Sequence, residues 1–175
     1  TFEGTIFLFG GWDGTSLQDT IYRYLADEQR WELYQTMPAA RADLAAATVQ
    51  DGIVLIGGTG ENGEALDEVF HFTPYHEPSL AKEAPLPTKD AAPKVVTLGN
   101  ALYLLSSEGT FFERSPLQEW KELSQLNQSL PKNAALVASD PYIIFLGGES
   151  ESTLVTNVWQ YQAIYRSFIP ITKQE

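Results

Sequence analysis

Four short apolar runs recur along the chain at nearly regular intervals. Together with the two residues that close them, they are 5–11 (TIFLFGG), 52–58 (GIVLIGG), 101–107 (ALYLLSS) and 142–148 (YIIFLGG). Their last residues stand at 11, 58, 107 and 148, so the steps are 47, 49 and 41 residues. Short apolar runs predict buried strands, and a recurrence of this length predicts a repeat architecture.

A second element follows each run and alternates aromatic with polar positions. In three copies it ends 13 or 14 residues after the second glycine, and the segments are 21–24 (IYRY), 69–72 (VFHF) and 158–161 (VWQY). In the third copy the segment 110–113 comes much sooner, which predicts a shortened loop. Alternation with a period of two predicts a half-buried strand, with Arg23, His71 and Gln160 on the side opposite the aromatic rings.

A third element and a fourth complete each unit. The third is predicted around Trp31, Leu80, Trp120 and Phe168. The spacing from Pro38 to Gly57 equals that from Pro87 to Ser106, so these segments align without a gap. They contain small-residue strands at 44–49 and 93–98, followed by predicted turns at 51–52 and 100–101. Residues 25–36 and 39–49 favour helix by composition, but their repeat counterparts do not, and register predicts strands.

Repeats of this length, with four short strands each, are typical of β-propeller blades. The glycine pairs, the aromatic second strand, the tryptophan beyond it and the segment 37–41 (MPAAR) resemble the kelch repeat over residues 5–171. The resemblance implies an all-β, kelch-type β-propeller of about four four-stranded antiparallel blades over residues 1–175. The approximate repeats are 5–37, 38–86, 87–130 and 131–175, of which the third is degenerate.

Kelch propellers usually close with six or seven blades, so the resemblance also implies a segment of a larger ring, with a self-closed four-bladed ring as the alternative. The apolar runs are expected to be inner strands near the propeller axis, covered on both faces. Glycine pairs at their ends permit close backbone approach. These structural glycines are Gly10, Gly11, Gly57, Gly58, Gly147 and Gly148.

Composition narrows the chemistry. The chain has no cysteine, which excludes a disulfide scaffold, a thiolate metal site and a cysteine nucleophile. It therefore lacks the tyrosine–cysteine crosslink that the copper oxidases similar to galactose oxidase need. A net charge of −12 argues against a nucleic-acid partner. The apolar runs are far shorter than the ~20 residues of a membrane span, so no membrane insertion is expected.

Three patterns suggest chemistry. Residues 58–63 match G-x-G-x-x-G, but the chain continues into a strand pattern where a dinucleotide site needs a helix, so a loop is predicted. His71, His76 and Glu77 could ligate zinc, but His71 occupies the outward alternate of a strand and is predicted to be solvated. The acidic clusters are predicted to be solvated turns. No catalytic residue, metal site or cofactor is expected.

The favoured hypothesis is a non-catalytic interaction or scaffold module that binds a protein partner through loops on one propeller face. Further blades, from the same precursor or another chain, are a second kind of partner. The acidity favours a basic partner. The candidate binding residues are Trp12, Asp13, Arg41, Glu61, Asn62 and Glu149. The alternative is a kelch-type sugar-modifying enzyme such as a sialic-acid mutarotase, with Arg41, Arg166 and Glu149 as candidates. Arg41 also has a structural interpretation, since kelch turns often carry a hydrogen-bonded arginine.

Overall fold

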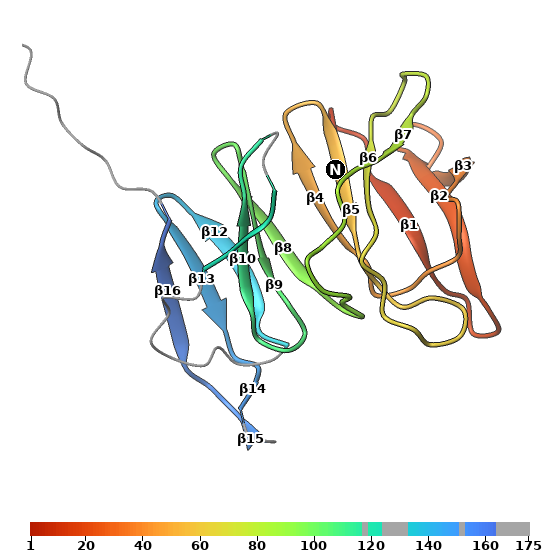
Figure 1. The fold of residues 1–175 in the computed structure, drawn as a ribbon. Helices are drawn as coiled ribbons and strands as arrows, with labels where there is room; N and C mark the ends of the chain where they lie inside the picture. Colours follow the sequence, from red (N-terminus) through yellow and green to blue (C-terminus); the bar gives the residue numbers. More distant parts are fainter. Residues whose placement is uncertain (117–118, 124–132, 151–152, 164–175) are drawn as a thin grey trace, which may run out of the picture.

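The computed structural model describes residues 1–116, 119–123, 133–150 and 153–163, and it forms four β-sheet blades in a row (Figure 1). Blade I contains β1 (Phe7–Trp12), β2 (Leu17–Leu25) and β3 (Arg30–Thr36). Blade II contains β4 (Ala45–Val49), β5 (Gly52–Ile56), β6 (Val69–Phe72) and β7 (Leu80–Lys82).

Blade III contains β8 (Lys94–Leu98), β9 (Ala101–Leu105), β10 (Phe111–Arg114) and β11 (Lys121–Glu122). Blade IV contains β12 (Ala135–Ser139), β13 (Tyr142–Leu146) and β16 (Val158–Gln162). A small hairpin, β14 (Glu149–Ser150) with β15 (Thr153–Leu154), lies in the loop between β13 and β16.

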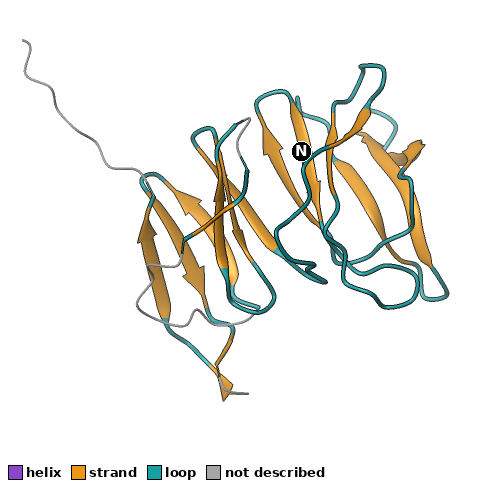
Figure 2. Ribbon diagram, viewed as in Figure 1, coloured by secondary structure: helices purple, strands orange, loops and turns teal. Residues whose placement is uncertain are grey.

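All regular structure in the described residues is strand, which confirms the all-β fold class (Figure 2). Both segments whose composition favours helix contain strands instead, β3 within 25–36 and β4 within 39–49. Among the described residues, no helix has the length and apolar character that a membrane span requires. The third element predicted around Phe168 lies outside the described residues.

In blades II to IV the apolar runs are not the innermost strands, whereas in blade I the run in β1 is an edge strand. In blade II the strand order is β4-β5-β6-β7, so the run in β5 lies second, between β4 and β6. The strands that face one another from blade to blade are those before the runs, because β8 contacts both β4 and β12. All five residues of β5 are buried because the strand is central in its sheet and the sheet is packed on both faces. The prediction of two covered faces is therefore correct for β5, whereas in blade I one face of the run is open and Leu8 is 51% exposed. The predicted innermost position is wrong for blades II to IV.

Two hairpin turns lie one residue earlier than predicted. Val49 pairs with Gly52, so the turn residues of the first hairpin are Gln50 and Asp51. Leu98 pairs with Ala101, which leaves Gly99 and Asn100 in the second turn. The shift follows from continuous pairing across the hairpin, in which the residue after the turn already belongs to the ladder.

Apolar clusters join each blade to the next. One cluster spans blades I and II, a second spans II and III, and a third spans III and IV. In the first, Phe72 is completely buried and its ring centroid lies 5.2 Å from that of Phe7, 5.4 Å from Phe9 and 5.7 Å from Tyr34. Edge-on aromatic pairs contribute roughly 0.5–1.5 kcal/mol each beyond the area they bury, so these rings are a main source of cohesion between blades.

A chain of threonines links the edge strands at the repeat period. The hydroxyl of Thr48 donates to the carbonyl of Thr1, and the hydroxyl of Thr97 donates to the carbonyl of Thr48, each at 2.7 Å. Thr48, Thr97 and Ala138 occupy equivalent ladder positions, since they pair with Ile53, Leu102 and Ile143. Ala138 has no hydroxyl, so it cannot continue this pattern into blade IV.

The outer face of blade I is apolar and open. Leu8 pairs with Tyr22, which pairs with Leu33, so the three side chains form one row across the sheet. Leu8 is 51% exposed and Leu33 is 54% exposed. The opposite face of the same sheet carries Phe7 and Phe9 and packs on blade II.

Candidate functional site

The blades have two different ends. One end, which we call the loop face, carries loops 13–16, 57–68, 106–110 and the described parts of 147–157, together with the joints 37–44 and 84–93 between blades. The other end, which we call the turn face, carries the hairpin turns, including 26–29, 50–51, 73–79 and 99–100. Five of the six candidate binding residues therefore come from segments at the loop face, and the sixth, Trp12, ends β1 directly before loop 13–16.

Glycine pairs fasten the joints to the loop face. Gly10 and Gly58 both have positive φ, at 52° and 101°, where an L side chain is strained. A Cβ on Gly10 would lie 2.4 Å from the carbonyl oxygen of Arg41, and one on Gly58 would lie 2.6 Å from that of Ala42. Joint 37–44 therefore passes directly over the first pair and also against the second, and the amide of Gly11 donates to the carbonyl of Arg41 at 2.8 Å.

Arg41 is buried between blades I and II. Its side chain is 2% exposed, with Nη2 2.7 Å from Glu68 Oε2 and its guanidinium 5.1 Å from the ring centroid of Phe70. Glu68 also pairs with Lys82 at 2.8 Å. The hydrogen bond from Lys82, followed by that from Arg41, lowers the pKa of Glu68, so the carboxylate remains ionised at neutral pH. This arrangement matches the structural interpretation of Arg41.

Asp90 occupies the aligned position in the next joint and is also buried. Its Oδ1 accepts the amide of Ala92 at 3.1 Å, and its Oδ2 accepts the amide of Ser107 at 2.9 Å. Ser107 belongs to the pair that replaces glycine in the third copy. An acidic side chain therefore binds the loop where that copy has lost its glycines.

Trp12 and Asp13 begin the first loop and differ in their roles. The Trp12 side chain is 61% exposed at the end of β1. Asp13 Oδ1 accepts the amides of Thr15 and Ser16, both at 2.8 Å, and Oδ2 accepts the Gln18 side chain at 2.8 Å. The amides of Ser16 and Thr15 lower the pKa of Asp13. Asp13 thus braces the loop that presents Trp12.

The remaining candidates differ in exposure. Glu61 and Asn62 are exposed at the tip of loop 57–68, where the Asn62 amide donates to Glu64 Oε2 at 2.8 Å. Glu149 is half-buried in β14 and pairs with Leu154. Arg166 lies outside the described residues. A binding role for any of these residues stays a prediction.

The loop face is strongly acidic. Its described carboxylates, besides the paired Glu68 and the buried Asp90, are Asp13, Asp43, Glu61, Glu64, Asp67, Glu108 and Glu149. In the described part of these loops and joints, the basic residues are Lys89 and the buried Arg41. Carboxylates collected at one end create a negative potential that attracts cationic groups.

The G-x-G-x-x-G segment lies in this acidic face and has a loop structure. The amide of Gly60 donates to the carbonyl of Glu64, and that of Gly63 donates to the carbonyl of Gly60, both at 2.9 Å. The chain then enters strand β6 rather than a helix. The pattern therefore comes from a glycine pair followed by a tight turn, as predicted.

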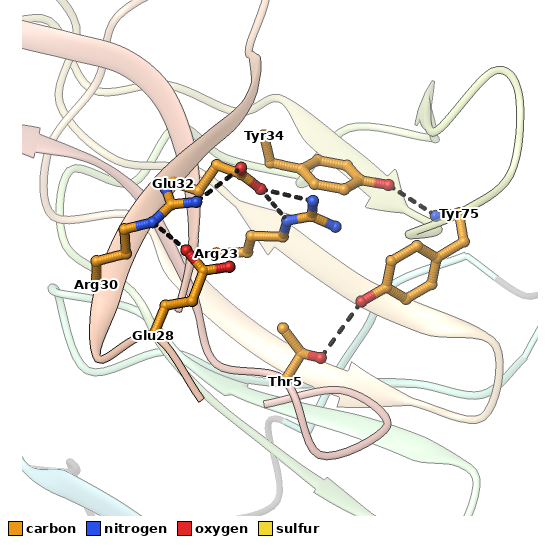
Figure 3. Close-up of polar contacts among 7 residues, drawn as sticks. All are labelled: Thr5, Arg23, Glu28, Arg30, Glu32, Tyr34 and Tyr75. Atoms are coloured by element: carbon orange, nitrogen blue, oxygen red, sulfur yellow. Dashed lines mark hydrogen bonds and ion pairs between the residues drawn. The ribbon is translucent and has the colours of Figure 1, made fainter. Parts of the chain in front are cut away.

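Polar contacts join blades I and II at the turn face (Figure 3). Arg23 Nη2 lies 2.5 Å from Glu32 Oε2, and its guanidinium lies 5.3 Å from the ring centroid of Tyr34. The Tyr34 hydroxyl accepts the amide of Tyr75, at 2.8 Å, from the β6–β7 turn. Tyr75 Oη is also 3.3 Å from Thr5 Oγ1, so the turn of blade II is fixed to the sheet of blade I.

A cavity of about 590 Å³ opens at the turn face between blades II and III. His71 lines it, and the prediction of a solvated His71 is wrong, because the side chain is 18% exposed. Its Nδ1 lies 3.0 Å from Glu83 Oε1, and its Nε2 lies 3.3 Å from Asp51 Oδ1. Arg114 of blade III approaches Glu83 Oε2 to 2.6 Å. Among the described residues, no group of His, Cys, Asp and Glu has an arrangement that could hold a metal ion.

Sequence reasoning missed this cavity because its residues come from distant segments. The repeats could have given one indication. Asp51 and Asn100 lie in equivalent hairpin turns of neighbouring blades, and the cavity lies between those turns.

Comparisons with known proteins agree with this architecture. The family model of the Kelch motif matches residues 1–38. Kelch-like protein 35 of Mus musculus is 25% identical over 151 residues, which cover 85% of this chain and 26% of that protein. Among solved structures, YjhT matches with a TM-score of 0.69 at 15% identity, over 83% of this chain and 56% of that chain. The chain therefore spans only part of the length of each.

Proposed function

Because this chain belongs to the kelch-repeat β-propeller family, we propose that it is a non-catalytic interaction module whose loop face binds a basic segment of a partner protein. The observation that carries the proposal is the exposed Trp12 at the edge of an acidic surface. Tryptophan is enriched among binding hot spots, and the surrounding carboxylates attract a cationic partner.

Local rigidity supports the same assignment. Asp13 holds the turn from Thr15 to Gln18 through three hydrogen bonds, so little conformational entropy is lost when a partner packs on Trp12. Arg41 is expected to contribute to binding only indirectly, by positioning the joint beneath the loops, because its side chain is buried.

The proposal is tested with basic peptides selected from a displayed library on the wild-type protein. We expect Trp12→Ala to weaken binding by at least tenfold, because a hot-spot truncation removes about 2 kcal/mol or more. Titration calorimetry measures the affinity, and thermal unfolding should show an unchanged Tm. Raising the salt concentration should weaken binding, since the exposed carboxylates are screened.

Trp31→Ala is the matched control. Trp31 is also exposed, at 45%, but it lies on β3 rather than on the loop face. Equal losses at Trp12 and Trp31, or peptides that bind Trp12→Ala as well as the wild type, would reject the assignment.

The enzymatic alternative makes a different prediction. A sugar-modifying enzyme would turn over substrates in an epimerisation panel and would lose turnover in Glu149→Gln with its folding intact. The buried ion pair of Arg41 disfavours this alternative, because the guanidinium is engaged by Glu68 and by the ring of Phe70.

Further blades remain the second proposed kind of partner. The open apolar row of Leu8, Tyr22 and Leu33 supports this part of the proposal, because such a row is suited to packing against another sheet. A blade docked there would bury Leu8 and Leu33 and leave the effect of Trp12→Ala unchanged, so the two kinds of partner are separable.

A further inference from the structure

The cavity between blades II and III is constructed from matching parts of both blades. Val54 of β5 and Leu102 of β9 form its apolar floor and belong to the core between the blades. The hydrogen bond from Thr97 to Thr48 joins the two blades beside the cavity, and the Glu83–Arg114 ion pair joins them at its wall. Its volume of about 590 Å³ is in the range of small-ligand sites.

Charges in the cavity are balanced except at one place. Glu83 is engaged twice, by His71 Nδ1 at 3.0 Å and by Arg114 Nη1 at 2.6 Å. Arg114 also lies over the ring of Trp120, at 5.1 Å. Asp51 is 75% exposed and stands above His71. When the imidazole is neutral, Asp51 therefore contributes the uncompensated charge, and the cavity carries a net negative charge.

Two acceptors then face each other. With its Nδ1 proton donated to Glu83, a neutral His71 presents the lone pair of Nε2 toward Asp51 Oδ1, 3.3 Å away. Nε2 is buried and has no hydrogen-bond partner among the described residues. Asp51 lies against Nε2 but is 75% exposed, so when its carboxylate turns aside a nitrogen with several N–H donors can lie between the two acceptors, about 2.8 Å from each.

We propose that this cavity binds a primary alkylammonium group between Asp51 and His71. An ammonium is compact and has three donors, whereas a guanidinium is a rigid planar fork, so the ammonium suits two closely spaced acceptors. Val49, Val54 and Leu102 can cover the methylene stem while the head stays near the polar mouth. The source of the group is either a lysine side chain of a partner or a small amine.

Protons compete with the ligand for His71. The hydrogen bond to Glu83 raises the pKa of His71, the nearby Asp51 raises it further, and burial and Arg114 lower it. When the imidazole is protonated, its Nε2–H donates to Asp51 and takes the place of the ligand. The ammonium therefore binds when His71 releases this proton to solvent. Affinity should therefore rise with pH through the pKa of His71. The β8–β9 turn at the mouth, Gly99 and Asn100, has no titratable side chain.

The two histidines of the chain allow a direct test. His71 lines the cavity and His76 is exposed in the β6–β7 turn, so NMR titration of the ring signals has an internal control. With n-butylammonium chloride at ten times its Kd, mass action should lower the apparent pKa of His71 by about 1 and leave that of His76 unchanged. An equal concentration of sodium chloride is the reference. Identical His71 curves in the two salts would overturn the proposal.

Three variants sharpen the test. Asp51→Asn should reduce affinity at least tenfold, whereas Asp27→Asn, the same charge change in another turn, should bind like the wild type. His71→Gln keeps an acceptor and should bind with no pH dependence between pH 6 and 8.5. Full binding by Asp51→Asn, or an unchanged pH dependence in His71→Gln, would also overturn the proposal.

Two peptides identify the source of the ammonium. If acetyl-Gly-Lys-Gly-amide lowers the pKa of His71 and its acetyllysine counterpart does not, the site accepts lysine side chains. If only n-butylammonium acts, the source is a small amine, and if neither amine acts the proposal fails. The cavity lies at the turn face, so this result is independent of the outcome at Trp12.

Discussion

The two central joints of the molecule perform the same task with opposite charges. Arg41 and Asp90 both follow a proline by three residues, both are buried, and both have a carbonyl that accepts an amide of the preceding glycine pair. Arg41 reaches forward to a carboxylate of blade II, and Asp90 reaches forward to a backbone amide of blade III.

The difference shows what each joint must match. Loop 57–68 keeps its glycine pair, whose amides donate to backbone carbonyls, and its Glu68 carboxylate accepts the Arg41 side chain. Loop 106–110 has serines in place of glycines, and the amide of Ser107 is satisfied by the carboxylate of Asp90. The charged residue in each joint is therefore complementary to the loop that follows it.

Removing Arg41 should produce the largest effect. Arg41→Met keeps much of the volume but leaves Glu68 with Lys82 as its remaining partner, and breaking a buried pair costs about 3 kcal/mol. Urea denaturation measures the free energy of unfolding. Arg30→Met is the control, because Arg30 is 50% exposed in its pairs and its loss should barely change the midpoint. Equal effects at both positions would contradict a special role for the buried pair.

Removing Asp90 should have a somewhat smaller effect. Asp90→Ala leaves the amides of Ala92 and Ser107 without an acceptor, which costs about 2 kcal/mol. Asp90→Asn keeps one acceptor oxygen and should lie between the wild type and alanine. Asp13→Ala also removes two amide contacts, but at an exposed site where water can replace them, and should cost clearly less. The reverse order of Asp90 and Asp13 would refute this account.

The smallest effect concerns pH. A lowered pKa in the folded state means that ionised Glu68 stabilises the protein above its ordinary pKa of about 4.3, and that this stability is lost as the pH falls through the folded value. The stability gap between wild type and Arg41→Met should therefore narrow by less than about 1 kcal/mol from pH 7 to pH 3.5. The stability gap between the wild type and Lys82→Met should also narrow as the pH falls over this range. A gap that stays constant over this range would show that Arg41 acts through packing alone.

Much of the fold was predictable because the repeat constrains it. The glycine pairs, the aromatic strands and the shortened third loop appear where the spacing places them. Sequence alternation assigns side chains to the two faces of a sheet, but in a propeller a neighbouring blade can cover either face. His71 was therefore assigned to solvent although blade III approaches that face of β6.

The chemistry of the candidate sites was less predictable. Alignment of the joints places Asp90 at the position of Arg41, so the sequence suggests only that the third copy lacks the arginine. The sequence does not reveal that the Asp90 carboxylate accepts the amide of Ser107. The candidates at the loop face could be selected because they follow or lie between the repeated apolar and aromatic runs. Trp12 was selected because it directly follows the first glycine pair, where the pattern assigns no packing role, although it is the last residue of β1. The cavity required the relative placement of two blades, which no local pattern specifies.

The threonine chain has a mechanical consequence. Each hydroxyl joins one repeat to the next, so the hydrogen bonds of Thr48 and Thr97 cross successive boundaries between repeats. A force applied to the chain ends would act on these two bonds in series. At the boundary between blades III and IV the equivalent residue is Ala138, whose side chain cannot make this hydrogen bond. Cohesion at this boundary therefore depends on the apolar cluster between blades III and IV rather than on a threonine hydrogen bond.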